Sequence, residues 1–327
     1  MPRTVPISRP WTRLVCPLGW ILVCCFCSTL PSELQAQDST VRIANQVVTL
    51  KEVVIRSKLN VAAFIDRIRK DSSFYKAFKN LKILGYTGLN DIRMMDKRGK
   101  LKASLYSRTR QQVAKGCRWM KVLEQQVTGD LFNRNGNWNY YTAQLYASLF
   151  FATDTICGDN NIVGDSGFDL AGKSGMEKRK EQLKMLIFDP GARIPGIPFI
   201  GDKIALFDEG VSDRYDFIID MAPFRGEMCY VFRIIPRGDL SASEKNQIVF
   251  NEMTTWFRIS DWDIVARTYD LSYNTGIYDF AVTMQVEMTR FKEFQVPSLI
   301  RYNGEWGLLF RKKERGVFTA TLFDFTQ

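Results

Sequence analysis

The chain contains no histidine among its 327 residues. That absence excludes Ser-His-Asp triads, histidine-ligated metals and pH switches based on an imidazole. Cysteine is also scarce, because four of the seven cysteines lie before Leu30. Cys117, Cys157 and Cys229 remain, so at most one disulfide can join them, and they are too widely spaced for a recognisable zinc site. We expect no metal and no other cofactor.

The amino terminus has the composition of an export signal. Arg3, Arg9 and Arg13 precede or begin an apolar run from Leu14 to Leu30, and a cleavage site fits after Ala36. The run is short for a spanning helix, and a retained amino-terminal anchor is the alternative. We therefore predict that residues 1–36 are a signal peptide and that the protein is exported to the periplasm or cell envelope.

The rest of the chain has the composition of a folded globular protein, with 46% hydrophobic and 24% charged residues. We predict an amino-terminal strand segment at 37–58 and a single β-rich domain at 59–327. The net charge is +10, and the densest basic cluster runs from Arg311 to Arg315. We interpret this cluster as a solvated turn, or else as a contact for an anionic surface. No nucleic-acid-binding motif is present, so we expect no nucleic acid partner.

The stretch from Tyr278 to Thr289 carries the strongest pattern. Apolar side chains alternate with polar ones at every position except Ala281. Such alternation predicts a strand with one buried and one wet face, about 40 Å long at 3.4 Å per residue. A strand of that length needs long antiparallel neighbours and a cover for its apolar face.

Period-two patterns recur along most of the chain, whereas two segments have helical spacing. Asn60 is a good N-cap for a helix near 60–81, with a break expected at Asp71 to Ser73. A second amphipathic helix is expected at 175–187, and Asn303-Gly304 is expected to form a hairpin turn. The predicted fold class is α+β: a mainly antiparallel, strongly curved sheet, or half-barrel, with amphipathic helices covering one face. Strands are expected at 41–44, 50–57, 83–88, 101–110, 118–126, 137–149, 215–221, 229–236, 248–259, 264–273, 278–291, 305–311 and 317–325.

An apolar surface is the strongest candidate for a binding site. It is either core beneath the helices or the wall of a cavity that takes an acyl chain. The candidate ligand-lining residues alternate along two strands, with one tryptophan between them: Tyr215, Phe217, Ile219, Met221, Trp256, Tyr278, Phe280, Val282, Met284, Val286 and Met288.

Motifs with chemical meaning are few. Ser73 and Lys76 match the S-x-x-K spacing of penicillin-binding enzymes, but the companion motifs occur in reversed order. Ser166 lies in a Gly-Asp-Ser-Gly tetrapeptide that lacks a histidine base, and we interpret it as a turn. Asp159, Asp165 and Asp169 could form an irregular calcium site, although the EF-hand pattern fails at its fifth and twelfth positions.

Two regions of different length resemble known envelope families. The segment Leu50 to Ser57 resembles the closing strand of carboxypeptidase-regulatory-like modules. The order of elements from Tyr215 to Val296, with the early helix, resembles the periplasmic lipoprotein-carrier superfamily that sorts outer-membrane lipoproteins. The matching parts are a strand-turn-strand with Trp256, Asp261 and Ile264, and the later Val296-Pro297. This resemblance implies a half-open barrel that holds lipid chains under helices.

Together these features favour a protein without catalytic activity. We predict that it binds a lipid, lipoprotein or envelope protein partner in an apolar groove of a curved sheet. The first alternative is an outer-membrane β-barrel or a barrel-associated structural protein, because long alternating strands also suit barrels. The second is a hydrolase that depends on a serine or a carboxylate.

Overall fold

The structure is a computed structural model of the full chain, which divides into two units, Met1–Gln35 and Ala36–Gln327. It describes residues 39–43, 46–51, 54, 59–158, 185–194, 200–274, 278–308 and 313–327, all in the second unit. The predicted signal peptide, Ser166, the three aspartates of the calcium hypothesis and most of the predicted 175–187 helix lie outside these residues. Within them, no helix is long and apolar enough to cross a membrane.

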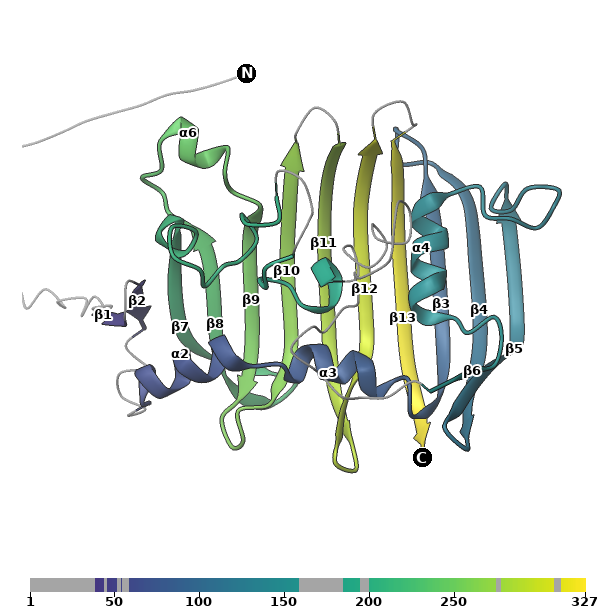
Figure 1. The fold of residues 1–327 in the computed structure, drawn as a ribbon, viewed down its shortest axis with the longest axis horizontal. Helices are drawn as coiled ribbons and strands as arrows, with labels where there is room; N and C mark the ends of the chain where they lie inside the picture. Colours follow the sequence, from purple (N-terminus) through teal and green to yellow (C-terminus); the bar gives the residue numbers. More distant parts are fainter. Residues whose placement is uncertain are drawn as a thin grey trace, which may run out of the picture. The chain divides into compact units, whose positions relative to one another are not determined.

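A single curved, unclosed sheet of 13 strands dominates the described residues (Figure 1). Its spatial order is β1-β2-β7-β8-β9-β10-β11-β12-β13-β3-β4-β5-β6. The strands are β1 (Ser39–Ile43), β2 (Gln46–Leu50), β3 (Gly85–Met95), β4 (Leu101–Ala114), β5 (Cys117–Gly129), β6 (Ile156–Cys157), β7 (Tyr215–Phe224), β8 (Glu227–Pro236), β9 (Phe250–Arg258), β10 (Ile264–Asn274), β11 (Tyr278–Phe291), β12 (Phe294–Leu308) and β13 (Glu314–Thr326).

Neighbouring strands are antiparallel, as predicted, with one exception. β2 runs parallel to β7, with Val48 opposite Phe217. A parallel pair needs a crossover, and the long segment from α2 to β6 lies between these two strands in the chain. The sheet therefore begins with a short β1–β2 hairpin added to the edge of a long antiparallel meander.

The predicted 60–81 helix is two helices, α2 (Val61–Lys70) and α3 (Ser73–Asn80). Asn60 is the N-cap of α2, as predicted, because its side chain accepts a hydrogen bond from the Ala63 N–H at 3.0 Å. The break at Asp71 is also confirmed: its backbone is extended, and its carboxylate accepts the Ser73 N–H at 3.2 Å. The described residues also form α4 (Tyr141–Phe150), α6 (Ala242–Lys245) and the 3-10 turn η1 (Ser212–Arg214), with a further helical turn at residues 185–188.

The alternation predicted for β11 is confirmed. Phe280, Val282, Met284 and Val286 are buried on one face, which we call the inner face. Glu287 points to the opposite, outer face, yet it is only 6% exposed because Arg225 pairs with its carboxylate at 2.5 Å. The outer face of β11 is therefore not uniformly wet.

The helices contact side chains of the inner face. In α2, Phe64 lies 5.6 Å from Tyr230 and 5.2 Å from Phe257, measured between ring centroids. In α4, Tyr146 lies 4.8 Å from the Phe318 ring. Buried aromatic pairs prefer particular ring geometries, in addition to the stabilisation from their buried apolar area. These contacts therefore fix where each helix lies on the strands.

Three predicted elements were wrong. Residues 137–149, predicted as a strand, contain α4 instead. Asn303-Gly304 does not form a turn, because both residues lie inside β12, which also contains the described part, 305–308, of the strand predicted at 305–311. The predicted 50–57 strand is contradicted where it is described, since β2 ends at Leu50 and Val54 is helical.

Candidate functional site

The candidate ligand-lining residues whose side chains the structure describes lie on both faces of the sheet. Those of β7 and β11 share the inner face, but the region above β7 is filled by Phe207, whose ring stacks on Phe217 at 5.9 Å. Trp256 lies on the outer face, because its neighbour Phe257 is buried under α2, and it contacts Phe224 at 5.6 Å. The Tyr278 side chain lies outside the described part of the chain.

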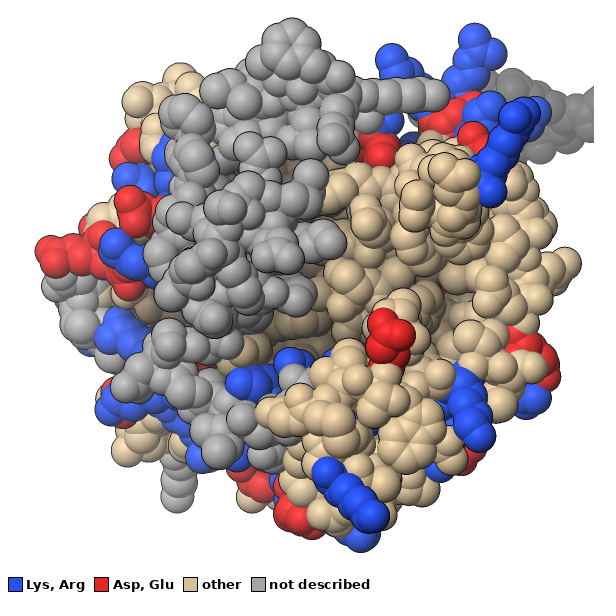
Figure 2. All heavy atoms as spheres, turned by 45° about the vertical axis from the view of Figure 1, so that its right-hand side comes forward, with Lys and Arg blue, Asp and Glu red and all other residues tan. Residues whose placement is uncertain are grey.

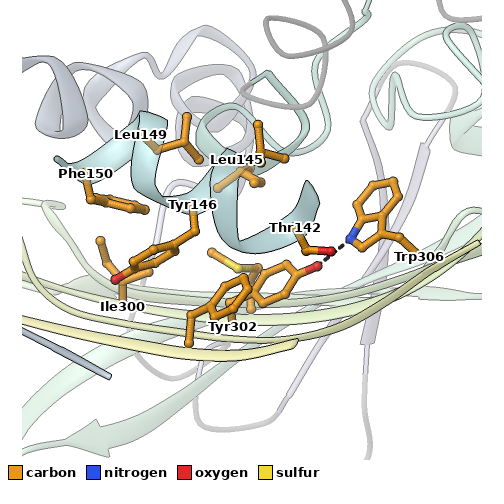
Figure 3. A pocket seen from close by; sticks show the side chains of 11 residues that line it. Thr142, Leu145, Tyr146, Leu149, Phe150, Ile300, Tyr302 and Trp306 are labelled. Atoms are coloured by element: carbon orange, nitrogen blue, oxygen red, sulfur yellow. Dashed lines mark hydrogen bonds between the residues drawn. The ribbon is translucent and has the colours of Figure 1, made fainter. Parts of the chain in front are cut away.

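A small apolar cavity lies between α4 and the inner face of β11, β12 and β13 (Figure 3). Its volume is about 20 Å³. Among the residues proposed from sequence, Met284 borders it. The full lining is Thr142, Leu145, Tyr146, Leu149, Phe150, Ile187, Met284, Ile300, Tyr302, Trp306 and Phe318.

The floor of the cavity is aromatic and flat. The rings of Tyr302 and Phe318 are stacked, with centroids 5.0 Å apart and an interplanar angle of 11°. Each ring lies along its own strand over a glycine, because a Cβ on Gly304 would lie 2.1 Å from the Tyr302 Oη, and one on Gly316 would lie 2.6 Å from the Phe318 Cζ. The two glycines leave the space in which these rings lie flat against the sheet.

Polar groups gather at one end of the cavity. The Trp306 indole N–H donates to the Tyr302 hydroxyl (Figure 3). The Trp306 ring stacks on Phe280 at 5.1 Å. Burial raises the pKa of Tyr302, so its hydroxyl stays protonated at neutral pH. Tyr146, buried in the α4 wall, also has a raised pKa, and its hydroxyl donates to Asn90 at 3.4 Å. The cavity lining thus carries no charge.

Glu314 fixes the amino-terminal end of α4. This residue opens β13, and its carboxylate accepts hydrogen bonds from the Tyr141 N–H at 3.0 Å and the Thr142 N–H at 2.8 Å. The Thr142 hydroxyl donates to the same carboxylate at 2.5 Å. The N-cap residue Tyr140 makes no side-chain cap, so an acid from the sheet satisfies the free N–H groups of the helix.

A buried charged cluster lies elsewhere on the inner face. Arg267 of β10 is 7% exposed, donates to the Thr255 hydroxyl at 3.0 Å, and lies 4.3 Å from the Phe74 ring centroid. Burial lowers the pKa of Arg267, whereas Asp71 and Asp189 raise it. Burial also raises the pKa of Asp189 to about 6, against the influence of Arg267. The cluster connects the α2–α3 junction and the 185–190 segment electrostatically to the sheet.

The serine and lysine of the S-x-x-K pattern do not line this cavity. Ser73 opens α3, outside the cavity lining, and Lys76 is exposed. Over the described ranges, no group of three Cys, Asp or Glu residues could hold a metal ion. One disulfide, Cys117–Cys157, joins β5 to β6, while Cys229 is free and buried.

Sequence reasoning missed most of the cavity. It placed α4 in a strand, and it did not single out Tyr302, Trp306 or Glu314. One signal in the sequence could have indicated the helix α4. Its cavity-lining residues are spaced as on one face of a helix: Thr142, Leu145, Tyr146 and Leu149. No local signal indicated Glu314, because it caps a helix far away in the chain.

Comparisons with known proteins give distant likenesses. No family model and no curated protein matches the chain. Among solved structures, an outer membrane lipoprotein-sorting protein domain from Vibrio parahaemolyticus matches with a TM-score of 0.26 and 10% identity, over 80% of this chain and 90% of that one. A DUF1329 family protein from Desulfovibrio piger matches with a TM-score of 0.24 and 10% identity, over 77% and 90%. At such low values neither likeness supports a shared function, so the site is interpreted from its own geometry.

Proposed function

We propose that the protein is an exported, non-catalytic envelope protein that binds an acyl chain of a lipid or lipoprotein between α4 and the inner face of β11–β13. The observation that supports this most is the lining of the cavity, which is apolar and aromatic apart from Thr142. Apolar pockets with a few polar groups at one end suit ligands that have a hydrocarbon part and a polar head.

The cavity is too small to hold an acyl chain as it stands. A volume of about 20 Å³ is enough for one water molecule or a methyl group. In this proposal the structure is the closed form, and α4 moves away from the sheet when a ligand enters. The acyl chain then takes the place of α4 side chains such as Leu145 and Phe150 against the strands, so apolar contacts are exchanged rather than lost.

The attachment of α4 is suited to such a movement. Its polar contacts with the sheet are few: Glu314 accepts hydrogen bonds from Tyr141 and Thr142 at its amino-terminal end, and the Tyr146 hydroxyl donates to Asn90 at 3.4 Å. Water can replace the hydrogen bonds to Glu314, because Glu314 is only partly buried. The helices α2, α3 and α4 form the cover in this proposal, and α4 is its moving part.

Two measurements test the proposal. Organic extraction of the purified protein followed by mass spectrometry should recover acyl species, and their absence would count against it. Titration with a fluorescent fatty acid should show saturable binding that Leu145→Trp weakens by about tenfold or more, because the larger ring fills the cavity. Met228→Trp is the matched control, since Met228 is 46% exposed on β8, away from the cavity. Unchanged affinity in Leu145→Trp would contradict the site.

A further inference from the structure

Four uncharged polar side chains are buried together beneath α4, beside the cavity. They are at most 4% exposed, and we call them the polar cluster: Asn90 of β3, Ser107 and Thr109 of β4, and Tyr146 of α4. Ser107 lies directly opposite Asn90 in the β3–β4 register, and Thr109 lies two residues further along β4, so the three share one face of the sheet. α4 crosses this part of the sheet and brings the Tyr146 hydroxyl to Asn90 (Figure 1).

The polar cluster adjoins the cavity along one row of the inner face. Asn90 lies opposite Ala320 of β13, and Ala320 lies opposite Ile300 of β12, which lines the cavity. Because neighbouring strands are about 4.8 Å apart, the backbones of Asn90 and Ile300 are about 10 Å apart. Tyr146 belongs to both places, since it lines the cavity and its hydroxyl bonds to Asn90. A ligand whose apolar part lies in the widened cavity can therefore place its polar end at the cluster.

The hydrogen bonds inside the polar cluster are long. The Asn90 amide donates to the Ser107 and Thr109 hydroxyls at 3.5 Å each, and its oxygen accepts the Tyr146 hydroxyl at 3.4 Å. Hydrogen bonds between such groups are strongest at about 2.7–3.2 Å. The Ser107 hydroxyl accepts the Asn90 bond but donates to no group that the structure describes. Buried polar groups that are bonded so loosely are stabilised when a ligand offers closer partners.

The polar cluster is uncharged at neutral pH. Burial raises the pKa of Tyr146, so its hydroxyl stays protonated, and the other three side chains do not ionise. Within the described chain, no charged side chain bonds to any of the four. Arg118 of β5 shares their face of the sheet, but it donates to Gln111, two residues beyond Thr109. A carboxylate or phosphate buried among the four would lack a counter-charge, which is unfavourable, whereas an uncharged head with donors and acceptors would be satisfied.

We propose that the polar cluster binds the head of the ligand, and that this head is uncharged and carries ester and hydroxyl groups, as in an acylglycerol. The cluster becomes accessible only when α4 moves, so the assignment rests on the proposed function. The Asn90 amide and the three hydroxyls can donate to an ester carbonyl and accept from hydroxyl groups. Figure 2, in which the side of the molecule with β3, β4 and β5 comes forward, shows a broad area with few charged side chains. An uncharged lipid therefore meets little charge on this side.

Calorimetric titration with two lipids of equal chain length tests the preference for an uncharged head. Monolauroylglycerol should bind the purified protein about tenfold or more tightly than laurate at pH 8, because only laurate brings a negative charge to the polar cluster. Equal affinities would overturn this assignment and leave the proposed acyl site standing. Tighter binding of laurate would also overturn it, and would favour Arg118 as the group that holds the head. If neither lipid binds, the proposed function itself fails, and the assignment fails with it.

Two variants that each remove one hydroxyl locate the head. Ser107→Ala and Thr109→Val should each weaken monolauroylglycerol binding about threefold or more and change laurate binding by less than about twofold. Ser104→Ala and Thr128→Val are the matched controls, since these residues bond to each other on the outer face of β4 and β5, and both lipids should bind to them as before. An equal loss for both lipids would show that the cluster only holds α4 against the sheet. A preference for monolauroylglycerol that neither variant reduces would place the head elsewhere, and either result would overturn the proposal.

Discussion

Glu314 of β13 accepts a hydrogen bond from the Thr142 N–H at 2.8 Å, although 172 residues separate the two in the chain. The carboxylate supplies at one point both the acceptor and the negative charge that a helix amino terminus favours. It therefore determines where α4 starts and how firmly α4 lies against the strands.

Replacing Glu314 with Ala should destabilise α4. Caps of this kind contribute about 1–2 kcal/mol, so the free energy of unfolding should fall by about that amount. Glu314→Gln keeps one acceptor and should lose less. Hydrogen exchange should speed up at the amides of Tyr141 and Thr142 in particular. Glu293→Gln, an exposed acid, serves as the control, and equal protection of α4 in all variants would contradict the assigned role.

Gly304→Ala should disturb the cavity floor. The new Cβ would lie 2.1 Å from the Tyr302 hydroxyl oxygen, so the Tyr302 ring must leave its place against Phe318. Overpacking of this kind costs about 1–3 kcal/mol, measurable by urea unfolding. Gly238→Ala is the control, because nothing lies within 4 Å of its added Cβ. If both variants unfold at the same urea concentration, the close approach of the Tyr302 ring to Gly304 does not contribute to the free energy of unfolding.

Asp189 should make stability depend on pH. Burial raises its folded-state pKa to about 6, above the unfolded value of 3.8, so the folded chain binds the proton more tightly. Stability from this group is therefore present below about pH 4 and is lost as pH rises toward 6. Asp189→Asn should remove the dependence and stabilise the protein at pH 7 by about 2–3 kcal/mol.

Urea unfolding at pH 5 and pH 7 measures this effect. The difference in unfolding free energy between Asp189→Asn and the unsubstituted protein should be larger at pH 7 than at pH 5. Arg267 and Asp71 act on the pKa of Asp189, so their influence is part of the measured difference, whereas titrating groups distant from Asp189 contribute equally to both proteins. A difference that stays constant between the two pH values would show that Asp189 titrates normally.

Reduction of the Cys117–Cys157 disulfide should destabilise the fold. The bond closes a loop with a sequence separation of 40, which corresponds to about 4 kcal/mol of unfolded-state entropy. Cys117→Ser with Cys157→Ser should lower the thermal midpoint accordingly. Cys229 provides an internal comparison, since burial raises the pKa of its thiol and should protect it from alkylation until the protein unfolds. Rapid labelling of Cys229 in the folded protein would contradict this.

The strands that sequence reasoning placed well carry a local pattern. In β7, β10 and β11, apolar and polar side chains alternate because one face is buried. β8 instead carries an apolar run, Cys229 to Phe232, that is buried on both faces. The break at Asp71 and the N-cap at Asn60 are equally local. Such features could be read from the sequence because their physical cause lies within a few residues.

The errors come from causes that lie far away in the chain. The α4 segment lacks an N-cap of its own, because Glu314 performs that function from β13. Gly304 follows an Asn and so resembles a turn residue, yet it lies in β12. A residue without a side chain is required there, because the Tyr302 ring occupies the space that a Cβ would fill. Pro297 looks unsuited to a strand, but it lies where the β11–β12 register shifts, and a bulge tolerates the missing N–H.

The position of β13 also has a consequence for how the protein is made. This strand lies between β12 and β3, and it joins residues near the carboxyl end to residues 85–95. During synthesis, β3 to β6 and β7 to β12 can each form hairpins, but the two halves of the sheet stay separate until β13 arrives. The pairing of β13 with β3 is therefore the last to form, and it joins residues more than 200 positions apart in the chain. Until then both neighbours of β13 are open edges, which exposes the nascent chain to mispairing and aggregation.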